Sequence, residues 1–499
     1  MTSMATTHSL EYVTPSVIKL PEMNDDVKKY LTYKDKTVQY QISRLKRNFY
    51  VNKDWKEATL IKMNGELFKT AYWEYEGNFY TYGGLAQNLS QSFGWPVVKP
   101  KYTEPKRSAM PWAKPPGFAM WRHQEDAVAK LLEQDHAAIS CPTGSGKSRI
   151  LLELVKTIGL PTIIITPSKS ISYQIYNEFV ERFGANKVGF FGDGKKDIKK
   201  FITVSISASL ANIKPGSKEW DFMKTKQLML ADESHTVPRD TLEPVCMNLL
   251  GHCLKRYFVS ATQMRNDGKD LLLEGIIGPI VYEKPFKELV EEKILAEPVW
   301  RFFNVPMSPA HGYSLDAMKE TRNHLYRNEN VNILAAEMAN KAVQDAGRPT
   351  VILIDEFWQF VHLMDKIKVP FVFAHGGATS SKEGDEESAL QQIPEKYLKM
   401  EASDAISDFN SGKVKLLIGT SAVSTGVDLK PTQCLIYMQG GISEIKVKQG
   451  VGRGTRMGPP GKTDCWVIDF IVNGSKTLER HANARKEIYE SMYGSAVII

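Results

Sequence analysis

The sequence contains little that would cross-link the chain or hold it in a membrane. It has five cysteines, an odd number, and no Cys-x-x-Cys pair, so neither a disulfide framework nor a zinc site is expected. No apolar run approaches the roughly 18 residues of a membrane-spanning helix. The first residues have neither the basic start nor the apolar stretch of a secretion signal. These absences predict a protein with free thiols in a reducing cytoplasm.

Acidic residues are the scarcer charge in the first quarter of the chain. Residues 1–115 contain 17 Lys and Arg against 11 Asp and Glu, in a protein whose whole net charge is +7. A basic segment of this kind suits an acidic polymer as partner. A solvated basic surface would have the same composition, so the charge alone leaves both interpretations open.

The periodicity of apolar residues predicts a small domain, a linker and two larger units. Over residues 1–95, alternating runs separated by Asn-Gly and Gly-Asn turns indicate a small α+β domain, with strands at residues 37–42 and 58–63 and one closing helix. Six prolines mark residues 96–117 as a stiff, basic linker. β-branched runs then alternate with helical patterns, which is typical of a parallel sheet covered by helices. The pattern occurs twice, and the two expected α/β domains are residues 118–297 and 298–499.

The glycine-rich stretch at residues 141–148, CPTGSGKS, lies between an apolar run and a helical pattern. A loop between strand and helix turns its backbone N–H groups toward a phosphate chain. Lys147 can reach the β- and γ-phosphates, and the Ser148 hydroxyl can bind Mg²⁺. Cys141 stands where the pattern usually has its first glycine, yet the stretch still predicts binding of ATP. The other loop residues expected to hold the nucleotide are Thr143, Gly144, Ser145 and Gly146.

Two carboxylates follow a second apolar run at residues 228–231. Asp232 and Glu233 would stand at the carboxyl end of a strand, where α/β sheets bind their ligands. Asp232 is expected to hold Mg²⁺, directly or through water, and Glu233 to orient or deprotonate the attacking water. In a sheet that already carries a phosphate loop, this pair predicts a hydrolytic site.

With these motifs the chain resembles the superfamily 2 helicases and translocases of the DExH type. The resemblance covers residues 118–475, with the motifs in family order. It implies two RecA-like domains, with ATP and Mg²⁺ as cofactors and a nucleic-acid strand as track. The residues that it assigns to the nucleotide are Phe118, Arg122, Gln124, Gly426, Asp428 and Gln449. Those that it assigns to the strand are Thr166, Pro167, Ser168, Lys169, His375, Gly376 and Thr420, and those that couple hydrolysis to movement are Ser260, Ala261 and Thr262.

A second half of the hydrolytic site is expected in the second unit. Residues 449–456, QGVGRGTR, match the family's motif VI, and its Arg453 and Arg456 would stabilise charge on the γ-phosphoryl group. When arginines and carboxylates belong to different units, hydrolysis requires closure of a cleft. Closure and opening of this cleft would then move the protein along a polymer that is bound to both units.

The segments that follow Ser260 are similar to phage recombination and repair helicases of the T4 type and to XPB-like helicases. Residues 260–268 and 277–298 carry this likeness, and so do His481, Arg485 and Tyr489 after Asp469. The branch works mainly on DNA, so the likeness implies remodelling of forks and Holliday junctions in replication, recombination or repair. The location would then be the host cytoplasm, and the protein could act as a monomer.

Three alternatives remain open at this stage. The ATPase motifs do not distinguish DNA from RNA, so an RNA helicase is one of them. The second is the motor subunit of a restriction system, which would need a partner nuclease. The third is a DNA-binding subunit with a vestigial ATPase, and the intact ATPase motifs argue against it. In the small domain, the aromatic residues between 72 and 82 are expected mainly to form its core rather than to stack on bases. The basic residues expected to meet phosphates there are Lys28, Lys29, Arg44, Lys46 and Arg47.

Overall fold

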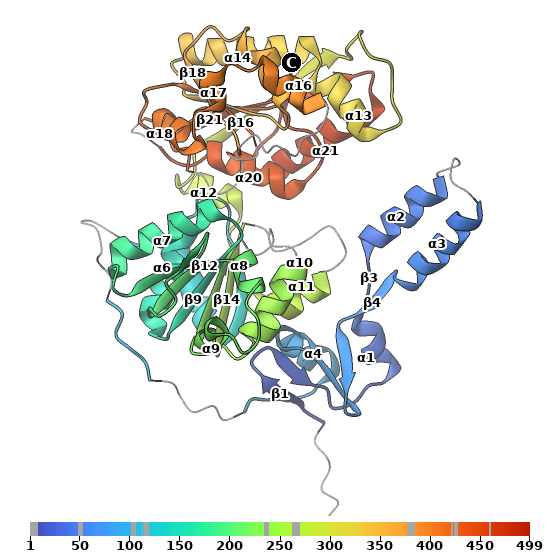
Figure 1. Cartoon of the computed structure of the whole chain (residues 1–499), viewed down its shortest axis with the longest axis vertical. Coiled ribbons are helices and arrows are strands. Elements are labelled where there is room, and N and C mark those ends of the chain that lie inside the picture. Colours follow the sequence, from blue (N-terminus) through green and yellow to red (C-terminus); the bar gives the residue numbers. More distant parts are fainter. Residues whose placement is uncertain are drawn as a thin grey trace, which may run out of the picture. The chain divides into compact units, whose positions relative to one another are not determined.

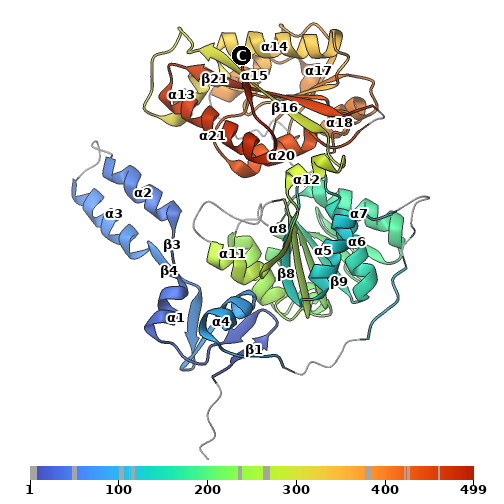
Figure 2. The same cartoon turned by 180° about the vertical axis from the view of Figure 1, so that it is seen from behind.

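The computed structural model describes residues 8–47, 53–100, 106–111, 113, 119–233, 239–261, 270–376, 385–420, 423, 428–458 and 461–499. The chain divides into two compact units. The first comprises Met1–Ser140 and Lys147–Glu283, and the second comprises Lys284–Ile499 with the loop Cys141–Gly146. Each unit is built on a sheet of mainly parallel strands (Figures 1 and 2). The predicted α/β class with two tandem parallel-sheet domains is confirmed by the two sheets.

The N-terminal region of the first unit has its own five-stranded sheet, in the order β5-β6-β2-β1-β7. The strands β1 and β2 pair antiparallel, and β7 joins β1 in parallel. The 3₁₀ turn η1 and the helix α4 lead from β6 to β7. The bounds are β1 Leu10–Thr14, β2 Val17–Lys19, α1 Asp25–Tyr30, β5 Tyr72–Tyr75, β6 Asn78–Tyr82, η1 Gly83–Leu85, α4 Ala86–Phe93 and β7 Val97–Val98.

A helical hairpin interrupts this small sheet. Helices α2 (Lys36–Arg47) and α3 (Lys53–Gly65) lie side by side beyond the ribbon of β3 (Thr32–Lys34) and β4 (Phe68–Thr70) (Figure 1). The strands predicted at residues 37–42 and 58–63 are therefore wrong. Val38 and Ile42 are buried while Tyr40 is exposed, and a spacing of four serves one face of a helix as well as a strand.

The first α/β sheet has the strand order β11-β10-β12-β9-β13-β14-β8-β15. All of its pairs are parallel except β10 with β11. Strand β9 (TIIIT) is buried along its whole length, as expected for a strand with helices on both faces. The strands are β8 His136–Ser140, β9 Thr162–Thr166, β10 Val188–Gly192, β11 Lys195–Lys196, β12 Ile202–Ile206, β13 Leu228–Asp232, β14 Lys255–Ser260 and β15 Ile280–Glu283. The helices are α5 Arg122–Leu132, α6 Lys147–Ile158, α7 Lys169–Phe183, α8 Ser207–Ala211, α9 Lys218–Met223, α10 Arg239–Pro244, η3 Val245–Leu249 and α11 Asp270–Ile277.

The N-terminal region and this α/β sheet share one hydrophobic core. Leu10, Ile18 and Leu31 belong to the same buried cluster as Leu242 and Phe258. Most of the predicted core aromatics are at least half-buried, but Trp73 and Tyr75 are exposed. The N-terminal region is therefore packed against the sheet and its helices rather than merely tethered to them.

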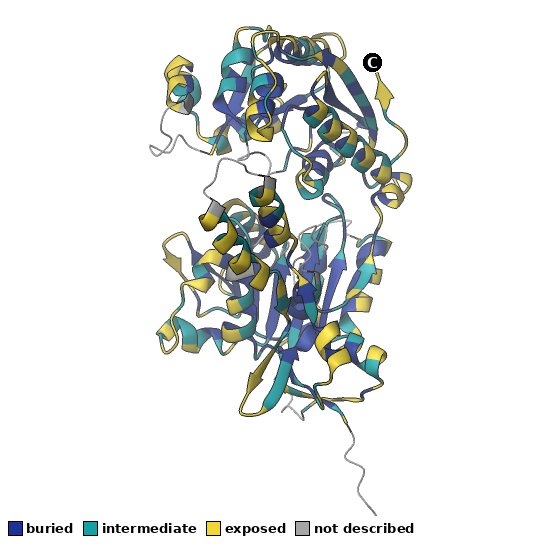
Figure 3. Ribbon diagram, turned by 90° about the vertical axis from the view of Figure 1, so that its right-hand side faces the viewer, coloured by how far each residue is buried: buried dark blue, intermediate teal, exposed yellow. Residues whose placement is uncertain are grey.

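The second unit is a seven-stranded sheet in the order β18-β19-β17-β20-β21-β16-β22, with every pair parallel. Apolar clusters line the sheet, and the outer faces of its helices are exposed (Figure 3). The strands are β16 Glu297–Pro306, β17 Thr350–Leu353, β18 Phe371–Ala374, β19 Leu416–Gly419, β20 Cys434–Tyr437, β21 Asp464–Asn473 and β22 Val497–Ile498. The helices are α12 Phe286–Glu291, α13 Ala317–Thr321, η4 Arg322–Tyr326, α14 Glu329–Gln344, α15 Phe357–Met364, α16 Asp385–Gln392, α17 Glu395–Leu398, α18 Ala402–Asn410, α20 Glu444–Gly454 and α21 Lys476–Met492.

Candidate active site

The phosphate loop connects strand β8 to helix α6, as the sequence predicts. Gly144 and Gly146 have φ angles of +91° and +76°, in a region that residues with side chains rarely adopt. Ser145 N donates to Pro142 O at 3.2 Å and closes a turn inside the loop. Helix α6 begins at Lys147, so the positive end of its dipole is available to a phosphate that the loop holds.

Glu233 is the centre of a cluster whose members come from three places in the sequence. Lys147 Nζ lies 3.1 Å from Glu233 Oε1, and Ser260 Oγ donates to Glu233 Oε2 at 3.3 Å. The backbone N–H of Ala261 is 3.5 Å from the same oxygen. Strands β13 and β14 are parallel neighbours, so their carboxyl ends bring the carboxylate and the hydroxyl together. Expected catalytic and coupling residues thus meet within one unit.

The backbone of Glu233 is strained in a way that suits an active site. Its φ is +49°, in the left-handed region, which costs a residue with a side chain roughly 1–2 kcal/mol. Its N–H donates to Val259 O at 2.9 Å and to Asp232 Oδ1 at 3.0 Å. These bonds hold the turn at the end of β13: Asp232 is the last residue of the strand, and Glu233 is the first residue after it.

Glu178 on helix α7 is a site neighbour that sequence reasoning missed. Its carboxylate accepts a hydrogen bond from Ser148, the expected Mg²⁺ ligand; burial raises its pKa above the usual range, and the Ser148 bond and nearby arginines oppose that rise. The neighbouring Arg149 lies with its guanidinium 5.0 Å from the ring centre of Trp121. No motif marks Glu178, because only the packing of α7 against the loop helix brings it here.

The residues expected to recognise adenine lie at the start of helix α5. Gln124 is buried, and its Oε1 accepts a hydrogen bond from Trp121 N at 3.0 Å. Arg122 is exposed and lies 4.0 Å from Asp126. Phe118 falls outside the described residues, as do Thr262 and Gly426. Their assignment to base, coupling and nucleotide contacts stays a prediction.

The first set of expected strand contacts lies where β9 ends and α7 begins. Thr166 is buried and shares a hydrogen bond with Ser172. Ser168 caps α7 by accepting from Ile171 N. Lys169 is exposed, and its Nζ lies 2.8 Å from Asp193 Oδ2. With Pro167 between them, these residues stand at the carboxyl edge of the sheet, on the strand next to the one that ends at Asp232.

The second set lies at the carboxyl ends of β18 and β19. His375 is buried, its Nε2 lies 3.3 Å from Tyr397 O, and its ring packs against Phe373. Gly376 beside it is exposed, whereas Thr420 is buried and donates its N–H to Ala374 O. The structure therefore gives His375 a packing role, and its contact with a strand stays a prediction.

The two arginines of the second unit are on or next to helix α20, which also carries Gln449. Arg453 is buried, and Arg456 Nη1 lies 2.8 Å from Asp428 Oδ1. Lys462, which sequence reasoning missed, is buried below the helix end and donates to Gly454 O at 2.8 Å and to Arg456 O at 2.5 Å. Burial lowers the pKa of Lys462 to about 8.

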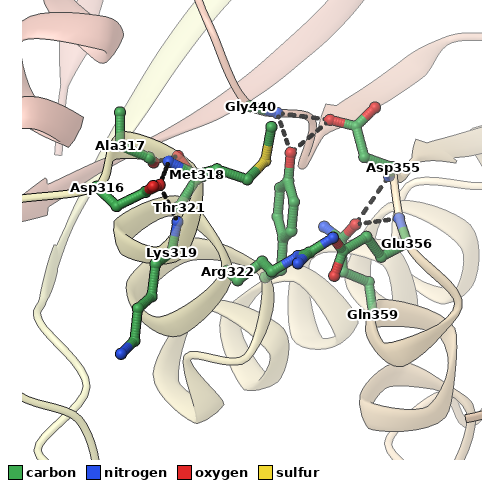
Figure 4. A network of polar contacts seen from close by, with 11 residues as sticks. Asp316, Ala317, Met318, Lys319, Thr321, Arg322, Asp355, Glu356, Gln359 and Gly440 are labelled. Atoms are coloured by element: carbon green, nitrogen blue, oxygen red, sulfur yellow. Dashed lines mark hydrogen bonds and ion pairs between the residues drawn. The ribbon is translucent and has the colours of Figure 1, made fainter. Parts of the chain in front are cut away.

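The loop before α20 is held by a polar network that no sequence motif predicts (Figure 4). Asp355 Oδ2 accepts from Tyr326 Oη at 2.6 Å and from Gly440 N at 2.9 Å, and Gln439 Nε2 donates to Asp355 Oδ1 at 3.0 Å. Asp355 follows β17 and Gly440 follows β20, so the network joins the carboxyl ends of two adjacent strands. It holds the chain at Gly440, shortly before α20 begins at Glu444.

The face of α21 that sequence analysis singled out completes this support. Arg485 makes two hydrogen bonds to Asp469, at 2.7 and 2.8 Å, and Tyr489 Oη donates to the same carboxylate at 3.0 Å. Arg485 Nη1 also donates to Gly441 O at 3.1 Å, next to the network of Asp355. His481, Arg485 and Tyr489 all lie on α21, and the contacts of Arg485 and Tyr489 with Asp469 are a finding of the structure.

Two family models match the chain over these sites. Residues 118–264 match "Type III restriction enzyme, res subunit", and residues 349–458 match "Helicase conserved C-terminal domain". The first span carries the phosphate loop and the carboxylates, and the second carries the arginines. No helix in the described ranges has the length and apolar character that a bilayer crossing requires.

Two curated proteins show how far the likeness extends. A protein of Sulfolobus islandicus filamentous virus named "Putative helicase 22" is 22% identical over 469 residues, which is 87% of this chain and 80% of that protein. The "DNA 3'-5' translocase XPB2" of Sulfurisphaera tokodaii is 26% identical over 210 residues, 42% of each chain.

Solved structures resemble the fold at low sequence identity. The helicase Lhr of Mycobacterium smegmatis, solved with single-stranded DNA and AMP-PNP, covers 75% of this chain and is itself covered to 49%, with a TM-score of 0.50 and 15% identity. UvsW of phage T4 matches over 98% of both chains, with a TM-score of 0.41 and 15% identity.

Proposed function

Because the chain belongs to the superfamily 2 helicases, we propose that it couples ATP hydrolysis to movement on DNA and remodels branched DNA in replication, recombination or repair. The observation that carries the proposal is the cluster of Lys147, Glu233 and Ser260 at the carboxyl edge of the first sheet. It joins a phosphate-binding lysine, a general base and a residue of the coupling motif through direct contacts.

The ion pair between Lys147 and Glu233 describes a resting state of this site. When ATP binds, Lys147 turns to the β- and γ-phosphates, which releases Glu233 to orient the attacking water. Ser260 contacts the same carboxylate, so a movement of the Glu233 side chain would also alter the hydrogen bond of Ser260, at the end of β14 where the coupling motif begins. Hydrolysis and rearrangement of that motif are thereby linked by a hydrogen bond.

Mg²⁺ fits the donors that the first unit offers. Ser148 and Asp232 provide a hydroxyl and a carboxylate, and Mg²⁺ in such sites takes most of its other ligands from phosphates and water. The described residues contain no group of three His, Cys, Asp or Glu side chains able to hold a metal by themselves. The ion would neutralise charge on the phosphates, and Ser148 would exchange its bond to Glu178 for it.

The basic N-terminal hairpin favours the proposal that the substrate is larger than a single strand. Helices α2 and α3 present Lys36, Lys46 and Lys62 to solvent, together with the exposed aromatic rings of Tyr40 and Trp55. Lysines beside exposed rings suit phosphates and unpaired bases. The side chains of Arg44 and Arg47 lie outside the description, so their expected phosphate contacts stay predictions. A phage origin is part of the proposal and rests on the similarity to a viral protein over 87% of this chain.

ATPase assays with single-stranded DNA, forked DNA, Holliday junctions and duplex RNA test the proposal. Forks and junctions should stimulate hydrolysis and be unwound or branch-migrated, whereas RNA should do neither. Stronger stimulation by RNA would make the protein an RNA helicase. Stimulation by long linear duplex without unwinding, together with a co-purifying nuclease, would favour the motor of a restriction system, which the first family model also suggests.

A further inference from the structure

A cavity of about 920 Å³ lies in the first unit between the N-terminal region and the base of the eight-stranded sheet. One wall is made by η1 and α4, a second by Lys99 and Arg107 of the linker, and a third by residues at the amino ends of β8 and β14. Cavities of roughly 300–1,000 Å³ hold small-molecule ligands in proteins. This volume would accommodate a molecule of about the size of a mononucleotide.

The cavity is separate from the nucleotide site. Asp135 and His136 stand at the amino end of β8, and Lys255 and Arg256 at the amino end of β14. The cluster of Lys147 and Glu233 lies at the carboxyl ends of the same parallel strands. The two sites therefore occupy opposite edges of one sheet, and a ligand in the cavity would not compete with ATP.

The lining is strongly basic. It includes four cationic side chains and a single carboxylate, Asp135. Asp135 already bonds to both Lys99 and Lys255, with the latter at 2.6 Å. One carboxylate shared by two lysines leaves the wall with a net positive charge, and a concave wall of one sign attracts the opposite charge.

Arg256 adds a charge that the fold does not balance. It is fully buried, and its two Nη atoms donate to Leu250 O and Cys246 O at 2.9 Å. Among the described residues its Nε has no hydrogen-bond partner. Burying a charge that is paired only with neutral carbonyls costs free energy, so an anion bound near Arg256 would offset part of that cost.

His136 lies beside Arg256 in the strand register and has the matching feature. Its Nε2 lies 2.8 Å from Ile276 O, so Nε2 carries the hydrogen and Nδ1 is an acceptor, which has no partner in the part of the chain that the structure describes. Burial and the positive charge of Arg256 lower the pKa of His136 to about 3, which keeps the ring neutral. Two adjacent buried side chains on the lining are thus incompletely satisfied by the protein itself.

We propose that this cavity binds a small anionic ligand through a phosphate or carboxylate group, with Lys99 and Lys255 as its direct charge partners and Arg256 as the buried positive charge behind them. Gln87, Ser90 and Gln91 on α4 line the opposite wall and offer hydrogen bonds to the rest of the ligand. Because both walls contribute, the ligand ties the N-terminal region to the α/β sheet.

The test measures the melting temperature of the full-length protein with inorganic phosphate, glycerol 3-phosphate or citrate, against sodium chloride at equal ionic strength. A ligand that binds only the folded state raises this temperature. The rise should occur in the wild type and in Lys147→Ala, which removes the phosphate-loop lysine. In the double variant Lys99→Gln, Lys255→Gln the apparent affinity should fall roughly tenfold or more, because the ligand's two charge-assisted hydrogen bonds are removed.

Each variant is compared with its own ligand-free baseline, since the lysine changes also remove partners of Asp135. Lys413→Gln is the matched control: this exposed lysine pairs with Asp408 in the second unit and should leave the rise unchanged. Comparing the rise in melting temperature with phosphate and with citrate shows whether the site prefers a phosphate or a carboxylate group. The proposal is overturned when no probe raises the melting temperature or when the double variant keeps the full rise. It is also overturned when the double variant loses fork binding without any effect of the small probes, which would make the surface a nucleic-acid contact.

Discussion

Tyr82 donates a hydrogen bond to Glu243, and this bond ties strand β6 of the N-terminal sheet to α10, the helix that follows Asp232 and Glu233 in the sequence. A second bond, from Asn88 to Glu274, ties α4 to the helix that follows the coupling motif. The N-terminal region thus contacts α10 and α11, the helices that follow β13 and β14 in the sequence.

Gly84 is the position at which this junction is most sensitive. A Cβ at Gly84 would lie 2.4 Å from Glu274 O and 2.6 Å from Gly275 O. The variant Gly84→Ala should therefore lose about 1–3 kcal/mol of unfolding free energy, because α11 must move away. Urea denaturation measures the loss.

Gly65→Ala serves as its matched control. A Cβ at Gly65 meets no atom within 4 Å, so this change should stay within about 1 kcal/mol of the wild type and favour helix α3. Equal stability of the two variants would mean that the close approach of η1 to α11 does not exist in solution.

The variants Lys147→Ala and Glu233→Gln should both lose DNA-stimulated ATPase activity, by about 10²-fold or more. They should differ in binding: Glu233→Gln keeps Lys147 and should still bind ATP, whereas Lys147→Ala should bind it weakly. Steady-state hydrolysis and binding of a fluorescent ATP analogue measure the two effects. Lys156→Ala on the same helix, where the lysine pairs with Glu153 away from the loop, should be unaffected.

The hairpin lysines should carry part of the affinity for branched DNA. Deleting residues 1–95 should weaken fork binding more than basal ATPase activity, but it would also remove Leu10, Ile18 and Leu31 from the shared core. The double variant Lys46→Ala, Lys62→Ala is cleaner, because both side chains are exposed. Fork affinity should fall, and the slope of log K against log salt should flatten by roughly 0.9 for each phosphate that the protein no longer neutralises.

Lys399→Ala is the control for this experiment, since Lys399 is an exposed lysine of α17's end that pairs with Glu395 in the second unit. An unchanged salt slope in the hairpin variant, measured by fluorescence anisotropy at several salt concentrations, would remove the hairpin from the DNA interface.

Lys462 should make stability depend on pH in an alkaline window. Its folded pKa of about 8 lies below that of an unfolded lysine, roughly 10.4. Between these values the unfolded chain binds more protons, so the unfolding free energy contributed by this site should rise as pH increases. Urea denaturation at pH 8 and pH 9.5 measures it as the difference between the wild type and Lys462→Met, which should grow in favour of the wild type. A difference that stays constant with pH would contradict the lowered pKa.

Sequence patterns predicted the local parts of the site because each depends on a few consecutive residues. The phosphate loop needs Gly144 and Gly146 for its positive φ angles, and Asp232 and Glu233 end a continuous apolar strand. The same reasoning failed in the hairpin, where Val38 and Ile42 fit both a strand and a helix. Helix α2 packs beside α3, and this contact joins residues that are not consecutive in the sequence, so the local pattern could not choose between the two periods.

What the sequence by itself determined was the set of residues from which the chemistry is predicted: a glycine-rich loop, two carboxylates about 85 residues after its lysine, and two arginines about 220 residues after the carboxylates. Only the tertiary structure decided which side chains support that chemistry. Glu178 meets Ser148, Lys462 holds the end of the helix that carries Arg453, and Asp355 joins two strand ends. Such contacts depend on how helices and strands pack, and no spacing along the chain encodes them. The shared core that binds the N-terminal region to the first sheet has the same origin, since its apolar residues became one cluster only when the two sheets met.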